Sequence, residues 1–335
     1  MAKGATIRFR GRVDDVLDEI TLGRKTYQIL ERLGGAERLR YRAFDRLAGP
    51  KGDYRAIHVL PRSPEVEQQL GVLQRLADVR NVNVPFVVEY HADREKVYLV
   101  LAWVWGTSLA DHLERIKEQR AKPASAMQAS RLIRGLAHGL CQLHHRWNVN
   151  HGDIKPANLI LAPEFRFLST IDFGSAWLAE RAAKRNAGDG ASGIYSAPEL
   201  LFDGRTPDFR SDQFSVSVIW YQLLTGQIPY DGVGGKAGAP GMEQVFASKL
   251  MPPGQSPAAS PDVPRRLWKS IDDGVCRGLA LNPDDRFADR REWLDALDEI
   301  HFGFRRRNKL SGFNRKIVEL LSKLTRRIDP PGAAD

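Results

Sequence analysis

The chain has 335 residues, of which 42% are hydrophobic and 27% are charged, and it carries a formal net charge of +9. This composition suffices for one two-lobed domain or two smaller domains, and it excludes general disorder. The two cysteines form no C-x-x-C pair and no apolar run reaches about 18 residues, so a disulfide framework, a zinc finger and a membrane-spanning helix are not expected. A reducing, cytoplasmic setting fits this pattern.

The first hundred residues predict a β-sheet. Short apolar segments between turn residues predict strands over 27–33, 41–44, 55–60, 86–90 and 97–101. A helix over 64–76 is predicted between the third and fourth strands, because its apolar residues recur every three or four positions. Residues 102–104 then join the sheet to the rest of the chain, which continues with a short predicted helix from Ser108.

The rest of the chain is predicted to be mainly helical. Residues 124–145 have apolar side chains at helical spacing, and residues 211–226 are apolar almost all round, which is typical of a helix buried in a large lobe. His138, Cys141 and His145 would share one face of the first helix. No fourth ligand is evident, so we interpret them as core or helix-end residues and not as a metal site.

Two short motifs follow the first of these helices. The stretch HGDIKPANLIL, residues 151–161, places a lysine two residues after an aspartate and an asparagine three residues after that lysine, and the run IDFG, residues 171–174, follows ten residues later. An acid, a cation and two oxygen ligands at this spacing supply the groups needed to handle Mg-ATP. The pattern resembles the protein kinase family, whose catalytic loop reads H-x-D-x-K-x-x-N and whose metal motif is D-F-G.

The resemblance covers about residues 24–300 and points to the bacterial Hanks-type Ser/Thr kinases. It implies an α+β fold with two lobes, a small β-rich one and a larger, mainly helical one. We expect an N-terminal extension over 1–23, the small lobe over 24–101, the large lobe over 102–300 and a basic tail over 301–335.

The resemblance also assigns roles to the motif residues, with ATP and Mg²⁺ as the expected ligands. Asp153 would accept or orient the proton of the substrate hydroxyl, and Lys155 would neutralise charge on the transferred phosphoryl group. Asn158 and Asp172 would hold Mg²⁺ through oxygen atoms. Ser192 takes the place where Ser/Thr-specific kinases carry a threonine, which favours a Ser or Thr acceptor over Tyr.

The small lobe departs from the family pattern. The glycine-rich turn G-x-G-x-x-G is reduced to Gly34 and Gly35, and V-A-I-K has become RAIH, which ends at His58. Histidine has an ordinary pKa of ~6.5, so it is mostly uncharged at neutral pH and cannot be assumed to replace the lysine. Gln69 takes the place of the lysine's glutamate partner, and it either bonds His58 or belongs to a solvated helix face.

Other residues of the small lobe are candidates for the nucleotide site. If Tyr41 takes the tyrosine place of the family's G-x-V-Y pattern, the resemblance puts Arg40 in the cleft-facing valine place. Arg38, two residues earlier, then points the same way, and either arginine could meet the ATP phosphates. Alternatively, both arginines are solvated or block the adenine site. Ala56 and Leu101 are expected to line the adenine pocket, while Trp103 either stacks on the base or belongs to ordinary packing within a lobe.

Further positions of the large lobe match the family in structural roles. Gly152 replaces the usual arginine before the catalytic aspartate, so switching by phosphorylation of the activation segment is not expected. Asp212 resembles the residue that anchors the catalytic loop. Arg286 resembles the arginine that pairs with Glu199.

The last segment of the chain is strongly basic. Residues 301–328 hold nine lysines or arginines and one acid, Glu319, and apolar residues recur at helical spacing from Phe313 to Ile328. Such an amphipathic helix can dock on its own domain, bind a partner groove or lie on an anionic membrane surface, and we favour docking or a protein partner. Nucleic acid is not expected as a partner.

Two functions follow from these residues. A divergent but active Ser/Thr kinase is favoured by the intact catalytic and metal motifs, because positioning and charge stabilisation supply most of the catalysis. A pseudokinase that acts as a nucleotide-sensing or scaffold module is favoured by His58, Gln69 and the shortened glycine turn. We interpret the chain as the enzyme.

Overall fold

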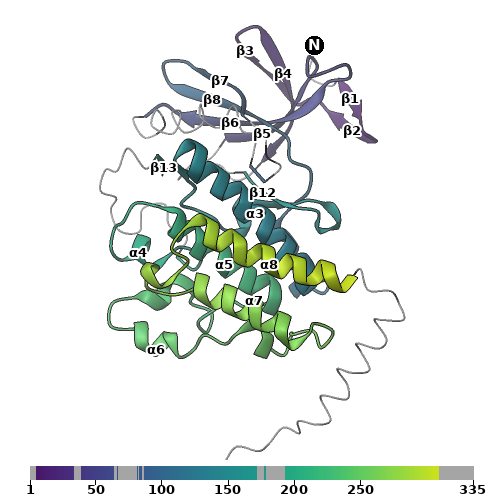
Figure 1. Ribbon diagram of the computed structural model, residues 1–335. Helices are drawn as coiled ribbons and strands as arrows, with labels where there is room; N and C mark the ends of the chain where they lie inside the picture. The colour runs from purple at the N-terminus through teal and green to yellow at the C-terminus, as the bar shows by residue number, and fades with distance from the viewer. Residues whose placement is uncertain are drawn as a thin grey trace, which may run out of the picture.

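The computed structural model describes residues 5–33, 39–63, 66, 81, 83–84, 87–171, 177–178 and 193–308. The chain forms a small β-rich lobe and a larger, mainly helical lobe, and it passes from the first to the second after the strand that ends at Ala102 (Figure 1). The α+β, two-lobed architecture predicted from the sequence is confirmed.

The small lobe is built on a six-stranded antiparallel sheet. Its strands lie in the order β3 (Asp18–Leu22), β4 (Lys25–Leu33), β5 (Leu39–Asp45), β6 (Asp53–Pro61), β8 (Lys96–Ala102) and β7 (Val87–Ala92). The five predicted strands are all present, and β3, which falls within the predicted N-terminal extension, is an edge strand of the same sheet. The helix predicted over 64–76 lies outside the described residues, apart from the buried Val66.

Strand alternation gives this sheet two different faces. Ile57 and Val59 are buried on one face, in a cluster of the small lobe's own apolar residues. The other face carries Ala56, which packs against the core of the large lobe together with Leu99 and Leu101 of β8. This second face, called the cleft face below, therefore looks toward the large lobe.

An N-terminal hairpin precedes the main sheet and has no counterpart among the predicted strands. It consists of β1 (Thr6–Phe9) and β2 (Arg12–Asp15), which pair with each other. Apolar residues in and around the hairpin are buried against the main sheet in one cluster. Its buried members are Ile7, Val16, Leu30, Phe44 and Tyr54. The hairpin is therefore packed onto the small lobe.

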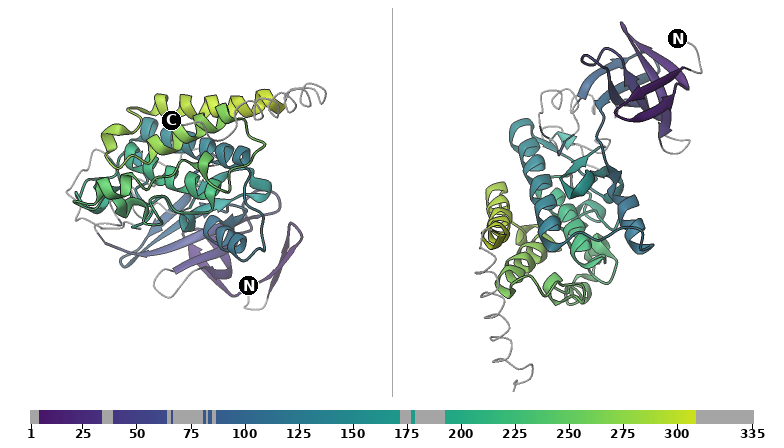
Figure 2. Two further views of the ribbon diagram at one scale, coloured as in Figure 1. Left: turned by 90° about the horizontal axis from the view of Figure 1, so that it is seen from below. Right: turned by 90° about the vertical axis from the view of Figure 1, so that its right-hand side faces the viewer.

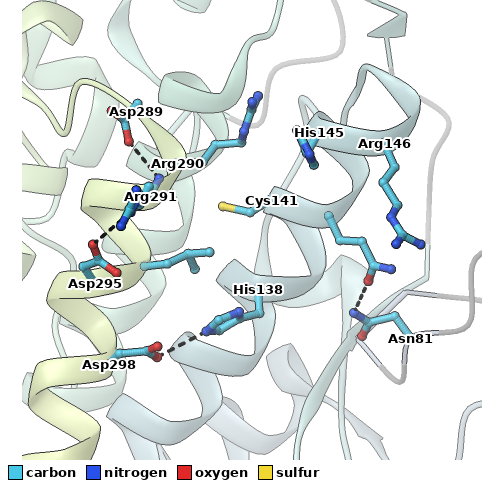
Figure 3. A pocket seen from close by; sticks show the side chains of 12 residues that line it. Asn81, His138, Cys141, His145, Arg146, Asp289, Arg290, Arg291, Asp295 and Asp298 are labelled. Carbon is cyan, nitrogen blue, oxygen red and sulfur yellow. Dashed lines mark hydrogen bonds and ion pairs between the residues drawn. The ribbon is translucent and has the colours of Figure 1, made fainter.

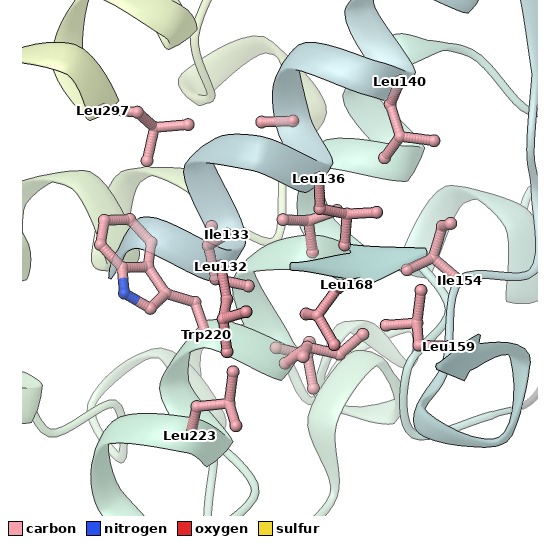
Figure 4. Close-up of a cluster of buried hydrophobic side chains, with 14 of the residues drawn as sticks. Leu132, Ile133, Leu136, Leu140, Ile154, Leu159, Leu168, Trp220, Leu223 and Leu297 are labelled. Atoms are coloured by element: carbon pink, nitrogen blue, oxygen red, sulfur yellow. The ribbon is translucent and has the colours of Figure 1, made fainter. Parts of the chain in front are cut away.

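The large lobe is a set of packed helices. They are α2 (Leu109–Lys117), α3 (Ala126–Trp147), α4 (Pro198–Leu201), α5 (Phe209–Thr225), α6 (Glu243–Ala247), α7 (Arg265–Gly278) and α8 (Arg290–Asn308). Helix α5 is buried along almost its whole length, as its apolar sequence predicted, and α3 and α7 pack against it. Figure 4 shows the apolar core around α3, with Leu132 and Leu136 of that helix near Trp220 and Leu223 of α5.

Helix α3 delivers the chain to the predicted catalytic loop. It begins with a capping box, in which Ser125 and Gln128 each accept a hydrogen bond from the other's backbone N–H. Its C-cap residue, Asn148, adopts the left-handed conformation with φ of 53° and ψ of 37°. The chain reverses there into β10 (Val149–Asn150) and enters the loop directly.

Short strands and 3₁₀ turns surround this loop and the later connections. A three-stranded sheet has the order β12 (Leu168–Thr170), β11 (Leu159–Leu161) and β9 (Thr107–Ser108), and β10 pairs with β13 (Trp177–Leu178). The 3₁₀ turns are η1 (Pro156–Asn158), η2 (Pro163–Phe165), η4 (Gly234–Gly238), η5 (Pro253–Gln255) and η6 (Pro283–Asp285). Just before β9, Gly106 lies so close to β11 that an added Cβ would be 2.2 Å from the Leu161 carbonyl oxygen. Only glycine fits there, so the segment that leaves the small lobe runs tightly against β11.

Helix α8 lies on the outer side of the large lobe, against α3 and α7 (Figure 2). It runs to Asn308, past the predicted end of the lobe at residue 300, and Phe304 near its end is buried in the large core. The chain from residue 309 onward lies outside the described residues. Among the helices described, none is both long enough and apolar enough to span a membrane.

Candidate active site

The structure brings the predicted catalytic side chains together in the loop between β10 and η1. Lys155 Nζ donates to Asp153 Oδ2 at 2.7 Å, and Asn158 Nδ2 donates to the same oxygen at 3.0 Å. Asn158 Nδ2 also donates to the backbone carbonyl of Asp153 at 2.9 Å. The Asp153 side chain is only 12% exposed, so these charge-assisted hydrogen bonds are partly shielded from water. A carboxylate, an ammonium group and an amide thus converge as the spacing predicted.

A buried carboxylate on α5 holds the backbone of this loop. Asp212 accepts hydrogen bonds from the backbone N–H groups of His151 and Gly152, each at 2.8 Å, and its Oδ2 lies 3.0 Å from His144 Nε2. Burial alone would raise the pKa of Asp212, but the interactions with His144, His151 and Gly152 outweigh burial and lower it. The predicted anchoring contact is confirmed. The contact with His144 was not foreseen, although the sequence places two histidines in the last turn of α3.

Local backbone geometry explains the glycine that precedes Asp153. Gly152 has φ of 74°, a conformation that residues with a Cβ rarely adopt. Its N–H is one of the two that Asp212 accepts, at 2.8 Å. Glycine therefore lets the loop make this turn, and the Asp212 carboxylate fixes the turn by accepting the Gly152 N–H.

Of the two residues predicted to hold Mg²⁺, Asn158 lies within the described part of the chain. Its amide nitrogen is engaged by Asp153, and within the described part of the chain its Oδ1 atom has no hydrogen-bond partner. Its backbone carbonyl accepts a hydrogen bond from Ile171 N–H at 3.0 Å. This bond brings the residue before Asp172 next to Asn158, while Asp172 itself lies outside the described residues.

The cleft face presents several of the residues predicted to bind the nucleotide. Arg40 of β5 is the register partner of His58 on β6, and Ala56 is the partner of Leu101 on β8. Partners in an antiparallel sheet project on the same side, so these four residues share the cleft face. Four further residues of the predicted small-lobe site lie outside the described residues: Gly34, Gly35, Arg38 and Gln69.

Trp103 packs against the cluster that the N-terminal hairpin forms with the sheet. Its ring meets that of Trp105 edge to face, with 6.4 Å between centroids, and the Arg42 guanidinium lies 6.0 Å from its centroid. The described contacts of the Trp103 indole are therefore packing contacts. Arg42 and its partner Asp14 were not predicted, since their pairing depends on a hairpin that the sequence pattern did not reveal.

The predicted pair of the large lobe is present. Arg286 Nη1 and Nη2 donate to the two carboxylate oxygens of Glu199 at 2.7 and 2.9 Å. Both side chains are almost fully buried, at 0% and 4% exposure. This two-pronged ion pair ties the start of α4 to the segment before α8.

A separate cavity of about 840 Å³ lies between α3 and α8 (Figure 3). His138, Cys141 and His145 line it from α3, and His138 Nε2 lies 3.2 Å from Asp298 Oδ1 of α8. Burial raises the pKa of the Cys141 thiol to about 12, so this cysteine is protonated at neutral pH. The described residues that line this cavity include none of those predicted for the nucleotide site.

The chain matches the protein kinase domain family over residues 49–296. It is 30% identical over 222 residues to the serine/threonine-protein kinase PknD of Mycobacterium tuberculosis, which covers 64% of this chain and 31% of that protein. It is 28% identical over 243 residues to the serine/threonine-protein kinase Pkn1 of Myxococcus xanthus (70% of this chain, 32% of that protein). It is 30% identical over 186 residues to the ribosomal protein S6 kinase alpha-4 of Homo sapiens (55% and 23%).

The chain thus spans about a quarter to a third of the length of these relatives. The family match covers most of the chain and includes both the catalytic loop and the cleft face of β6 and β8. The chain belongs to the protein kinase family.

Proposed function

We propose that this chain is a serine/threonine protein kinase, which transfers the γ-phosphate of ATP to a Ser or Thr hydroxyl of a protein. The observation that carries the proposal is the meeting of Lys155 Nζ and Asn158 Nδ2 on one oxygen of Asp153, at 2.7 and 3.0 Å. The family match and the similarity to Ser/Thr kinases support the same reaction.

Each side chain has a role that fits its surroundings. Asp153 accepts or orients the proton of the acceptor hydroxyl, and Lys155 balances negative charge on the phosphoryl group as it moves. The amide oxygen of Asn158, together with the carboxylate of Asp172, would hold Mg²⁺, since both are the oxygen ligands that this ion prefers. Bound Mg²⁺ would neutralise charge on the ATP phosphates.

The cleft face offers a cation in place of the missing lysine. Arg40 lies directly across from His58, the position where the family carries that lysine. A guanidinium is always charged and reaches further than an imidazole. We therefore infer that Arg40, with Arg38 nearby in the sequence, binds the ATP phosphates. Ala56 and Leu101 would then contact the adenine.

The partners of such an enzyme are proteins. We infer a protein substrate. We also infer that the part of the basic tail beyond α8, residues 309–335, contacts its own domain or a groove on a protein partner in preference to an anionic membrane surface. A cytoplasmic location suits this activity. Cross-linking of the full chain followed by peptide mapping would show whether the tail contacts its own large lobe.

The test of the function is phosphotransfer from Mg-ATP by the purified protein. We expect the isosteric variant Asp153→Asn to lower the rate by about 10²- to 10⁴-fold, the usual contribution of a general base. Asp203→Asn is a matched control, because it removes the same charge from an aspartate that is 56% exposed elsewhere on the large lobe. Equal rates in the wild type and Asp153→Asn would contradict the proposal.

The same measurement separates the enzyme from a pseudokinase. A wild-type chain that binds Mg-ATP but transfers no phosphate would act as a nucleotide-sensing or scaffold module. Binding should be followed directly, for example by calorimetry. The substitution at His58 is the feature that would explain such a result.

A further inference from the structure

The N-terminal hairpin covers the hinge, which we define as residues 102–106. Trp103 and Trp105 of the hinge pack against the cluster that the hairpin forms with the sheet. The guanidinium carbons of Arg10 and Arg12 lie 5.7 and 5.3 Å from the Trp105 ring centroid. The hairpin thus holds both hinge indoles through packing and cation–π contacts.

Arg42 joins the hairpin, the sheet and the hinge. Its side chain is 9% exposed, its Nη2 donates to Asp14 Oδ1 of β2 at 2.8 Å, and its Nε donates to Glu31 Oε2 of β4 at 2.9 Å. Its guanidinium carbon lies 6.0 Å from the Trp103 ring centroid and 5.4 Å from that of Tyr54. The second oxygen of Asp14 accepts a hydrogen bond from the Tyr54 hydroxyl at 2.5 Å.

Asp14 is the central group of this arrangement. A buried guanidinium is costly unless a carboxylate pairs with it, and of the two partners of Arg42 the side chain of Asp14 is 12% exposed while that of Glu31 is 53% exposed. Solvent therefore screens the attraction between Arg42 and Asp14 less than the attraction between Arg42 and Glu31. Burial opposes the ionisation of Asp14, but the hydrogen bonds from Arg42 and Tyr54 outweigh it and lower its pKa. Asp14 is a carboxylate at neutral pH.

The hinge is fixed at both of its ends. On the cleft face, Arg42 is the register partner of Ala56, which in turn lies opposite Leu101, the last residue before the hinge. At the far end, Gly106 runs tightly against the carbonyl of Leu161 in β11. The second contact belongs to the large lobe, whereas the hairpin acts on the small-lobe side of the hinge, through the cluster that holds Trp103 and Trp105 and through the bond from Arg42 to Asp14.

We propose that Asp14 is a positioning residue for the nucleotide: by holding Arg42 against Trp103, it fixes the hinge beneath the cleft face. The inference rests on the proposed function, since ATP must bind between that face and the catalytic loop. Loss of Asp14 would loosen the hinge and weaken ATP binding. The transfer step itself would stay unchanged, because Asp212 holds the catalytic loop separately.

The neighbouring residue provides a matched control. Asp15 is exposed, and its side chain accepts a hydrogen bond from Thr6 Oγ1 at 3.2 Å. Asp14→Asn and Asp15→Asn remove the same charge from adjacent positions of β2. We expect Asp14→Asn to raise the KM for ATP by about fivefold or more, within the usual range of coupling between sites, with kcat nearly unchanged. Asp15→Asn should leave both constants unchanged, and Asp14→Glu should restore part of the loss.

Hydrogen exchange tests the hinge without nucleotide. The amides of residues 103–106 should exchange faster in Asp14→Asn than in Asp15→Asn, while those of the catalytic loop stay the same. A folded Asp14→Asn chain with unaltered KM and unaltered hinge exchange would overturn the positioning role, as would a uniform loss of protection across the small lobe. A wild-type chain that fails to bind ATP would refute the proposed function, and hinge exchange would then still decide whether Asp14 fixes the hinge.

Discussion

The catalytic loop and the cleft face of the small lobe are held together in different ways. The predicted catalytic side chains of the loop all come from residues 153–158, and one buried carboxylate, Asp212, holds the loop through the backbone N–H groups of His151 and Gly152. The cleft face instead combines Arg40, Ala56 and Leu101 from three strands, so its geometry depends on strand register. The loop is thus a local structure with a strong support, whereas the cleft face is assembled from contacts that are distant in the sequence.

The strongest support of the large lobe should be the Glu199–Arg286 pair. Arg286→Ala leaves the Glu199 carboxylate buried without a partner, so we expect a loss of about 3 to 5 kcal/mol in the free energy of unfolding. Urea denaturation would measure this loss.

The control for this change is an exposed ion pair of the same lobe. Asp284 is 76% exposed and pairs with Arg210, so Asp284→Ala should cost less than about 1 kcal/mol. Similar losses in the two variants would show that the buried pair does not support the large lobe more than a surface contact does.

The support of the catalytic loop is the next largest effect. Asp212→Asn keeps the shape of the side chain but removes its charge and one acceptor, so one backbone N–H of the loop loses its partner. We expect a cost of about 1 to 3 kcal/mol in stability and a lower rate of phosphotransfer, with the KM for ATP unchanged. Asp203→Asn is again the exposed control. A raised KM for ATP with a normal rate would show that the loop affects ATP binding and that the loop and the cleft face do not act separately.

The sequence was also more informative about the loop than about the small lobe. The side chains of the loop were assigned residue by residue from the resemblance to one short family motif, which was possible because they are neighbours in the sequence. The strands of the small lobe were also predicted, since Ile57 and Val59 alternate with polar or small residues. The role of Asp14 could not be predicted, because its partner Arg42 lies 28 positions away and the pairing forms only once the hairpin docks.

The hairpin itself gave little signal. Its two strands have four residues each, and only Ile7 among them is buried, so the apolar alternation that marks longer strands is missing. The packing of Trp103 depends on the same docking. Predicting this side of the small lobe therefore required knowledge of a tertiary contact.

The cation of the cleft face provides a sharper test of that region. Arg40→Met should weaken ATP binding by about 10-fold, the usual loss for one charge-assisted hydrogen bond. Arg32→Met removes the same charge from β4, where the register partner is Tyr41 on the opposite face, and should leave binding unchanged. The double variant Arg40→Met with His58→Lys should recover affinity, since a lysine would then occupy the family's position. Calorimetry with Mg-ATP would measure all three.

The smallest expected effect is the loss, at acidic pH, of the stability that Asp14 provides. The pKa of Asp14 in the folded chain lies below its ordinary value of 3.8, so the carboxylate stabilises the fold above that value, and this contribution is lost as the pH falls through 3.8 toward the lower folded value. The difference in unfolding free energy between the wild type and Asp14→Asn should be about 1 kcal/mol at pH 7, because asparagine keeps part of the hydrogen bonding. It should shrink toward zero as the pH falls below 3.8. A difference that stays constant with pH would mean that the Asp14 charge does not hold the hairpin, and the cleft face would then owe its geometry to strand register alone.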